Sequence, residues 1–101
     1  MDRRNELSDI LNSIDGVKKA YFQPPQSVSL VYPCILYRLR AIESEHANDL
    51  PYTNRDCYQI TIIDRNPDSK IRQWFMNQPL CRFDRFYTAD NLNHWVFVLY
   101  Y

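Results

Sequence analysis

Glycine is almost absent from this sequence, since Gly16 is the only one among 101 residues. Loops that bind phosphate through backbone N–H groups need several closely spaced glycines, and flexible linkers are rich in the same residue. The scarcity therefore argues against a nucleotide-binding loop and against a disordered linker. A chain of this length typically forms one domain, and we expect a single domain over residues 1–101.

The sequence also lacks an excess of charge of either sign, because 12 lysines and arginines balance 12 aspartates and glutamates. Proteins that bind nucleic acid gain affinity by neutralising phosphates and usually carry a basic excess. We therefore expect no specific nucleic-acid binding. Apolar runs stay far below the roughly eighteen residues of a membrane span, and no apolar signal-peptide segment is seen. We expect a soluble protein, made in a cytoplasm, with no membrane partner.

Closely spaced metal ligands are missing as well. Cys34, Cys57 and Cys81 are an odd number at wide spacings, which argues against a disulfide framework. Structural zinc sites use ligand pairs about two to five residues apart, and adding His46 and His94 supplies no such pair. We interpret the cysteines as small core residues and predict no metal site.

Two further clusters were weighed for catalysis. Asp90 and His94 lie close in sequence, but no serine or cysteine stands in a nucleophile motif such as G-x-S-x-G. Glu43, Glu45 and Asp49 gather acidic groups in one polar segment, as a metal nuclease or glycosidase would need, but also as a solvated loop has. We predict that the protein is not an enzyme and has no cofactor.

A first helix is predicted near the N-terminus from apolar residues at helical spacing. The stripe on its buried face consists of Leu7, Ile10, Leu11 and Ile14. Gly16 follows at the place of a left-handed residue that ends a helix.

A second helix is predicted after residue 65. Asn66 is the expected N-cap and Pro67 the first helical residue, while Pro79 ends the helix. The side chains expected to face the core are Ile71, Trp74 and Phe75.

Alternating apolar residues predict four strands, in residues 31–43, 55–64, 80–89 and 94–101. Residues 44–54 are polar and contain a proline, so we expect a long hairpin loop there. Residues 17–30 are expected to form an extended arm or loop, because Pro24 and Pro25 interrupt regular structure. Residues 90–93 are a predicted turn. The order helix, two strands, helix, two strands predicts an α+β domain with both helices on one face of a mostly antiparallel sheet.

The last predicted strand is apolar on both faces. One face is expected to meet the helices, and the other is expected to stay open for a partner. Together with the polar segment before it in the chain, this strand supplies ten candidate assembly contacts. They are Glu43, Glu45, His46, Asp49, Tyr52, Trp95, Phe97, Leu99, Tyr100 and Tyr101.

Three segments occur in the order PPQSVSLVYPCILYRL, YTNRDCYQITIIDRNPDS and RFYTADNLNHWVFVLYY. Together they resemble a family of small proteins of tailed phages and prophages, encoded near the head–tail connector genes. Its members are described as tail completion, tail terminator or minor tail proteins. The similarity covers residues 22–101, and none of its motifs is a catalytic signature.

The resemblance implies a structural protein of the virion tail or neck that assembles in the cytoplasm of the host bacterium. Such proteins form a ring, commonly a hexamer, at the head-proximal end of a long non-contractile tail tube. The implied partners are further copies of the chain, the tail tube protein and the neck proteins, with DNA passing through the ring. The alternatives are another neck component, such as a head-completion or adaptor ring, a small metal-binding or enzymatic domain, and a nucleic-acid binder.

Overall fold

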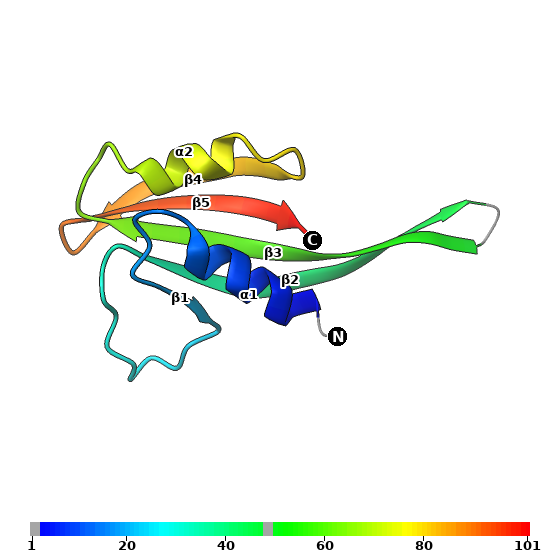
Figure 1. The fold of residues 1–101 in the computed structure, drawn as a ribbon, viewed down its shortest axis with the longest axis horizontal. Coiled ribbons are helices and arrows are strands. Elements are labelled where there is room, and N and C mark those ends of the chain that lie inside the picture. Colours follow the sequence, from blue (N-terminus) through cyan, green and yellow to red (C-terminus); the bar gives the residue numbers. More distant parts are fainter. Residues whose placement is uncertain (1–2, 48–49) are drawn as a thin grey trace.

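The computed structural model describes residues 3–47 and 50–101, with the side chains of residues 4–40 and 56–101. Figure 1 shows a five-stranded sheet with two helices. In chain order the elements are α1 (Arg3–Ser13), β1 (Lys19–Phe22), β2 (Cys34–Ala47), β3 (Leu50–Asp64), α2 (Lys70–Met76), β4 (Cys81–Ala89) and β5 (Leu92–Tyr100). The strands lie in the order β1-β2-β3-β5-β4, and only β1 and β2 are parallel. The predicted α+β class with a mostly antiparallel sheet is confirmed.

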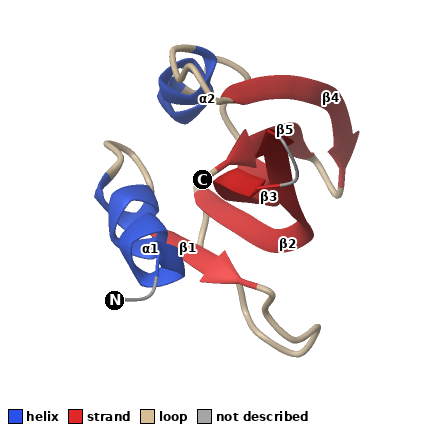
Figure 2. Cartoon of the chain, turned by 90° about the vertical axis from the view of Figure 1, so that its right-hand side faces the viewer, coloured by secondary structure: helices blue, strands red, loops and turns tan. Residues whose placement is uncertain are grey.

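Both helices lie on one face of the sheet, as predicted (Figure 2). Leu7 and Leu11 of α1 and Ile71 and Phe75 of α2 are at most 1% exposed. They pack against alternate strand residues, which are Ile35, Tyr37, Tyr58, Ile60, Ile62, Trp95, Phe97 and Leu99. Each large apolar side chain buried in this way stabilises the fold by about 1.5–3 kcal/mol, which makes this layer the main core.

Helix α1 ends where the sequence predicts, and Gly16 has the left-handed φ of +95°. Three of the four stripe residues are buried, whereas Ile10 is 36% exposed because it lies at the edge of the stripe. Within the described residues, neither helix is long and apolar enough to cross a membrane.

Helix α2 begins at Lys70, three residues later than predicted. The Asp64 Oδ1 atom accepts the Asn66 N–H at 2.9 Å, and the Asn66 Oδ1 atom accepts the Asp68 N–H at 2.9 Å. Such side-chain bonds to the backbone two residues on compete with helical hydrogen bonding. Asn66 therefore organises a turn ahead of the helix instead of capping it.

The segment predicted as an arm contains strand β1. It pairs with β2 in parallel, from Lys19 opposite Cys34 to Phe22 opposite Tyr37. Parallel neighbours need a crossover connection, and residues 23–33 supply one without a helix. The arm prediction is wrong for residues 19–22 because the pairing partner lies beyond the prolines and is invisible to local pattern.

Asn12 joins α1 to β1. Its Oδ1 atom accepts the N–H of Ala20 at 3.0 Å, and its Nδ2 atom donates to the Ser8 carbonyl at 2.8 Å. We expect Asn12→Ala to lower the free energy of unfolding by about 1–3 kcal/mol, because the Ala20 N–H loses its acceptor in a partly buried place. Urea denaturation measures the loss. Asn12→Asp keeps an acceptor oxygen and should cost less; equal losses for the two variants would count against this role.

Strands β2 and β3 continue past the rest of the sheet as a two-stranded ribbon (Figure 1). Strand β5 pairs with β3 only from Cys57 onward, whereas β2 and β3 stay paired as far as Ala47 opposite Leu50. The loop predicted over residues 44–54 is therefore wrong. A ribbon has open edges that admit polar residues, and Pro51 stands next to a register shift, where the missing N–H is tolerated. We call the paired residues 42–47 and 50–56 the ribbon.

On the sheet face that carries no helices, the central side chains are nevertheless buried. Val96 and Val98 on β5 are 0% and 1% exposed. Val98, for example, stands between Gln59 on β3 and Arg82 on β4, and long side chains of this kind cover apolar neighbours with their stems. One end of this face is covered further by residues from the crossover, because Leu30 and Tyr32 pack on Tyr21, Cys34 and Ile63.

Candidate assembly surfaces

Three of the ten predicted contact residues lie in the core. Trp95, Phe97 and Leu99 are 5%, 0% and 7% exposed, and all three face the helices. Since the valines on the opposite side of β5 are buried too, the prediction of an open apolar face on this strand is wrong. The central position of β5 between β3 and β4, together with residues of the crossover, explains why both faces are covered.

Tyr100 and Tyr101 are half-buried and tied to the rest of the fold. The Tyr101 N–H donates to the Asp56 carbonyl at 2.9 Å, and the Asp56 N–H donates to the Tyr101 carbonyl at 3.3 Å. The Tyr101 hydroxyl donates to the Glu6 carboxylate at 3.3 Å, which links the C-terminal residue to α1. Their partial exposure leaves them available at the surface as predicted contacts.

The other five predicted contacts fall in or beside the ribbon. Asp49 lies outside the described residues, and so do the side chains of Glu43, Glu45, His46 and Tyr52. Their backbone positions, apart from Asp49, belong to β2 and β3. The structure thus separates the predicted set into residues of the ribbon and residues of the sheet body.

An apolar groove lies between the two helices at the C-terminal end of β5. Its volume is about 200 Å³, and its walls include Ile10, Trp74, Leu80 and Tyr101. Ile10 and Leu80 are 36% and 44% exposed. The groove has the character of a protein contact, because apolar side chains line it and exposed apolar surface of this kind marks interaction sites.

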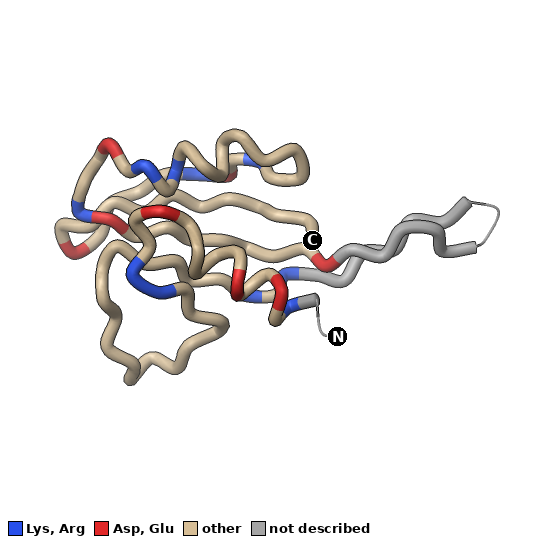
Figure 3. Tube along the Cα trace, in the orientation of Figure 1, with Lys and Arg blue, Asp and Glu red and all other residues tan. Residues whose placement is uncertain are grey.

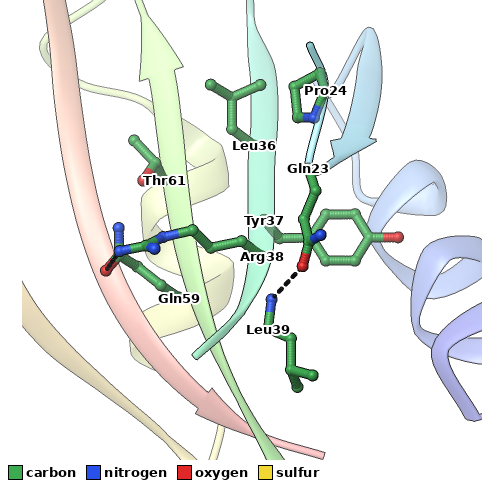
Figure 4. A pocket seen from close by; sticks show the side chains of 8 residues that line it. All are labelled: Gln23, Pro24, Leu36, Tyr37, Arg38, Leu39, Gln59 and Thr61. Carbon is green, nitrogen blue, oxygen red and sulfur yellow. Dashed lines mark hydrogen bonds between the residues drawn. The ribbon is translucent and has the colours of Figure 1, made fainter. Parts of the chain in front are cut away.

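A second, polar cleft of about 560 Å³ lies on the helix-free face, beside the crossover (Figure 4). The Gln23 Oε1 atom accepts the N–H of Leu39 at 3.1 Å, which holds the crossover against β2. The Arg38 Nη2 atom donates to Gln59 Oε1 at 3.1 Å and lies along the cleft floor. Arg38 is the one charged side chain among the residues that line it, so the cleft can hold a polar or acidic group but offers no acid–base pair.

Asp90 and His94, the candidate catalytic pair, lie at and beside the turn between β4 and β5. Asp90 and Asn91 have φ values of +54° and +63° and form the two-residue connection between β4 and β5. The ring of His94 stacks on Tyr87 with centroids 4.6 Å apart, and its Nδ1 atom bonds the Leu92 carbonyl at 3.1 Å. Left-handed residues at both positions are what a tight hairpin of this kind requires.

The three cysteines are free, with Cys34 and Cys57 buried. Within residues 4–40 and 56–101, whose side chains the structure describes, no three His, Cys, Asp or Glu residues come together as a metal site. Burial raises the pKa values of the Cys34 and Cys81 thiols to about 11. Since thiolates are the reactive and metal-binding form, these two thiols are inert at neutral pH.

The raised thiol pKa values predict how stability depends on pH. The native state holds these protons up to about pH 11, whereas the unfolded chain releases them near pH 9. The thiol contribution is therefore constant below pH 8 and is lost as the pH rises from about 9 to 11. Urea unfolding of the wild type and of a Cys34→Ala, Cys81→Ala variant should show a stability difference that shrinks over this interval. A difference independent of pH would contradict the assignment.

Strand β4 forms a free edge of the sheet and is exposed along its length from residue 82 to residue 89. Phe83, Phe86 and Tyr87 are 46%, 48% and 41% exposed. The ring of Phe83 contacts that of Phe97, and the ring of Phe86 contacts that of Trp95, with centroids 5.4 Å apart in each pair. Exposed edge strands are templates for pairing with another chain, so the apolar surplus of the sequence is at the surface here and not on β5.

Charges of both signs are interspersed over the described part of the chain (Figure 3). Comparison with family models, curated proteins and solved structures finds no match to this chain. The functional argument therefore comes from the sequence and from the geometry of these surfaces.

Proposed function

We propose that this chain is a structural assembly protein of a tailed phage. It acts as a tail terminator or tail completion protein, forming a ring, in our proposal a hexamer, at the head-proximal end of the tail tube. The ring joins the tube to the head connector, and its partners are further copies, the tail tube protein and neck proteins. The protein assembles in the host cytoplasm and stays in the virion.

The observation that carries the proposal is the projecting ribbon. Strand pairing continues past Cys57, where β5 stops, to Ala47 opposite Leu50. Two strands alone are marginally stable in water and gain stability when another surface packs against them. A domain of 101 residues that extends its sheet in this way is suited to reaching a neighbouring subunit or the tube.

The available surface is compatible with a ring. Each subunit of a head-to-tail ring presents two different contact patches. At about 800 Å² for each patch, the two occupy about a quarter of the accessible surface of 6697 Å². The ribbon is one candidate patch and the apolar groove between the helices is another. The sequence resemblance to tail completion proteins gives the same class of function.

Electron microscopy of particles made without this gene tests the proposal. We expect abnormally long tubes without heads, because nothing stops tube growth, and normal virions when the gene is supplied in trans. Full heads beside tails of normal length would instead identify a head-completion or adaptor protein. Normal virions without the gene would overturn the proposal.

A further inference from the structure

We propose that two copies of this chain pair edge to edge through β4, so that their five-stranded sheets become one continuous sheet around a two-fold axis. The inference goes beyond the proposed function and stands on described residues of β4 and its neighbours. It identifies a second copy of the chain as the partner of the exposed edge.

The backbone of β4 has its outer groups available. The Leu80 carbonyl accepts the Tyr100 N–H at 2.9 Å, so the backbone groups of Leu80 point toward β5. Alternation along an antiparallel strand then directs the backbone groups of Cys81 and Phe83 away from β5. The Cys81 N–H donates to the Gln78 carbonyl at 3.4 Å, so the Cys81 carbonyl and both backbone groups of Phe83 face the open edge. At the other end, Ala89 and Leu92 flank the two-residue turn and form the bonded pair that closes the hairpin. Phe86 and Thr88 therefore also face the open edge.

A bulge at Asp84 determines which side chains share a face. The register with β5 shifts between Phe83, opposite Phe97, and Arg85, opposite Val96. Before the bulge the odd-numbered residues face the helices, and after it the even-numbered ones do, so that Phe83 and Phe86 both lie on the helix side. Two-fold pairing that keeps like faces together must therefore join residues before the bulge to residues after it.

The register centred between Asp84 and Arg85 meets this condition and is self-complementary. It places Phe83 opposite Phe86 of the second copy and Asp84 opposite the second copy's Arg85, each pair occurring twice. It also brings Arg82 opposite Tyr87, where a cation can meet an aromatic ring. The residues whose backbone groups face the open edge coincide in this register, because Phe83 meets Phe86, and Cys81, through its carbonyl, meets Thr88.

The neighbouring registers are disfavoured by charge and by face. A shift of one residue places Asp84 opposite its own copy or Arg85 opposite its own copy, and like charges directly opposite destabilise strand pairing. The same shift sets helix-side rings against side chains of the other face. In the single chain Asp84 and Arg85 pair with each other at 2.6 Å, while both remain exposed enough to exchange partners.

Sedimentation equilibrium of charge variants tests the pairing. Asp84→Arg and Arg85→Asp each create two like-charge pairs, and each should raise the dimer dissociation constant by about tenfold or more. An equimolar mixture of the two variants restores both opposite-charge pairs, so native mass spectrometry should find the heterodimer in excess over either homodimer. The double variant should dimerise as the wild type does. Asp15→Arg, an exposed charge change away from β4, is the matched control and should leave dimerisation unchanged.

The opposite results are equally clear. A wild type that stays monomeric, or single variants that dimerise as well as the wild type, would overturn the β4 pairing. Rings formed by wild type and variants alike would overturn it while the assembly role stands. A dimer with the expected charge pattern, together with normal virions in the absence of the gene, would overturn the proposed function and leave the pairing intact.

Discussion

Replacing Phe97 with alanine is expected to lower the free energy of unfolding by about 3–5 kcal/mol. The Phe97 side chain is fully buried. Its ring stacks on Phe75 of α2 with centroids 5.5 Å apart and meets the ring of Phe83 edge-on at 5.4 Å. Because β5 is held on both sides by β3 and β4, the backbone cannot move inward to fill the space, and a cavity stays behind.

Thermal unfolding followed by far-UV circular dichroism measures the effect. For a domain of this size each kcal/mol lowers Tm by roughly 4–8 °C, so the midpoint should fall by at least about 12 °C. Met76→Ala is the matched control, since this side chain of α2 is 58% exposed and its truncation should cost less than about 0.5 kcal/mol. Similar losses for the two variants would show that the core is not organised around β5 as described.

Part of this fold can be read from local pattern. Tyr58, Ile60 and Ile62 are buried under the helices, while Gln59 and Thr61 between them are half-exposed, as strand alternation predicts. Such patterns are reliable because burial on one face of a regular element repeats with its own period. The two helix stripes succeed for the same reason.

Other features depend on contacts between distant residues. The ribbon residues are polar, and polarity suits a loop and an open ribbon equally well. The pairing between the two strands, for example Glu43 opposite Arg55, determines that a ribbon forms. The local sequence pattern does not show which residues pair with which. The four residues of β1 likewise become a strand only because β2 lies beside them, although eleven residues separate the two strands in the chain.

The candidate surfaces show the same limit. Strands β4 and β5 both carry aromatic residues, but β4 also carries Arg82, Asp84 and Arg85, whereas β5 has no aspartate, glutamate, lysine or arginine. The strand order places β5 in the middle, where Phe97 is 0% exposed, and β4 at the edge, where Phe86 is 48% exposed. Charged residues are typical of an edge strand, so the composition of β4 is the local signal for its place. The prediction of an open apolar face on β5 is wrong because strand order across a sheet depends on the whole fold.

Shortening the ribbon is expected to leave the domain folded and to abolish its assembly function. The variant replaces residues 44–54 with Asn-Gly, which joins Glu43 to Arg55, two residues that are already paired. Asn-Gly is a favoured sequence for a two-residue turn between antiparallel strands. All pairs between β3 and β5 lie outside the deleted segment, since they begin at Cys57.

Two measurements separate folding from assembly. Urea unfolding should give a free energy within about 1 kcal/mol of the wild type, because the deleted strand pairs lie beyond β5 and two strands alone are marginally stable. Complementation of a phage that lacks the gene should yield no infectious particles from the shortened chain. A shortened chain that fails to fold would show that the ribbon belongs to the core, and one that complements fully would show that assembly does not need it.

A second variant distinguishes the shape of the ribbon from its charge. Glu43→Gln, Glu45→Gln and Asp49→Asn together remove three carboxylates and keep the length of the segment. If the ribbon acts through its length, the neutral variant should still complement the phage that lacks the gene, while the shortened chain should not. If it acts by meeting a basic neighbour, both should fail, and the defect of the neutral variant should resemble that of the wild type at high salt, because salt screens exposed charges. The ribbon would then be recognised by charge, and a basic surface on the tube or on the next subunit would be the place to look for its partner.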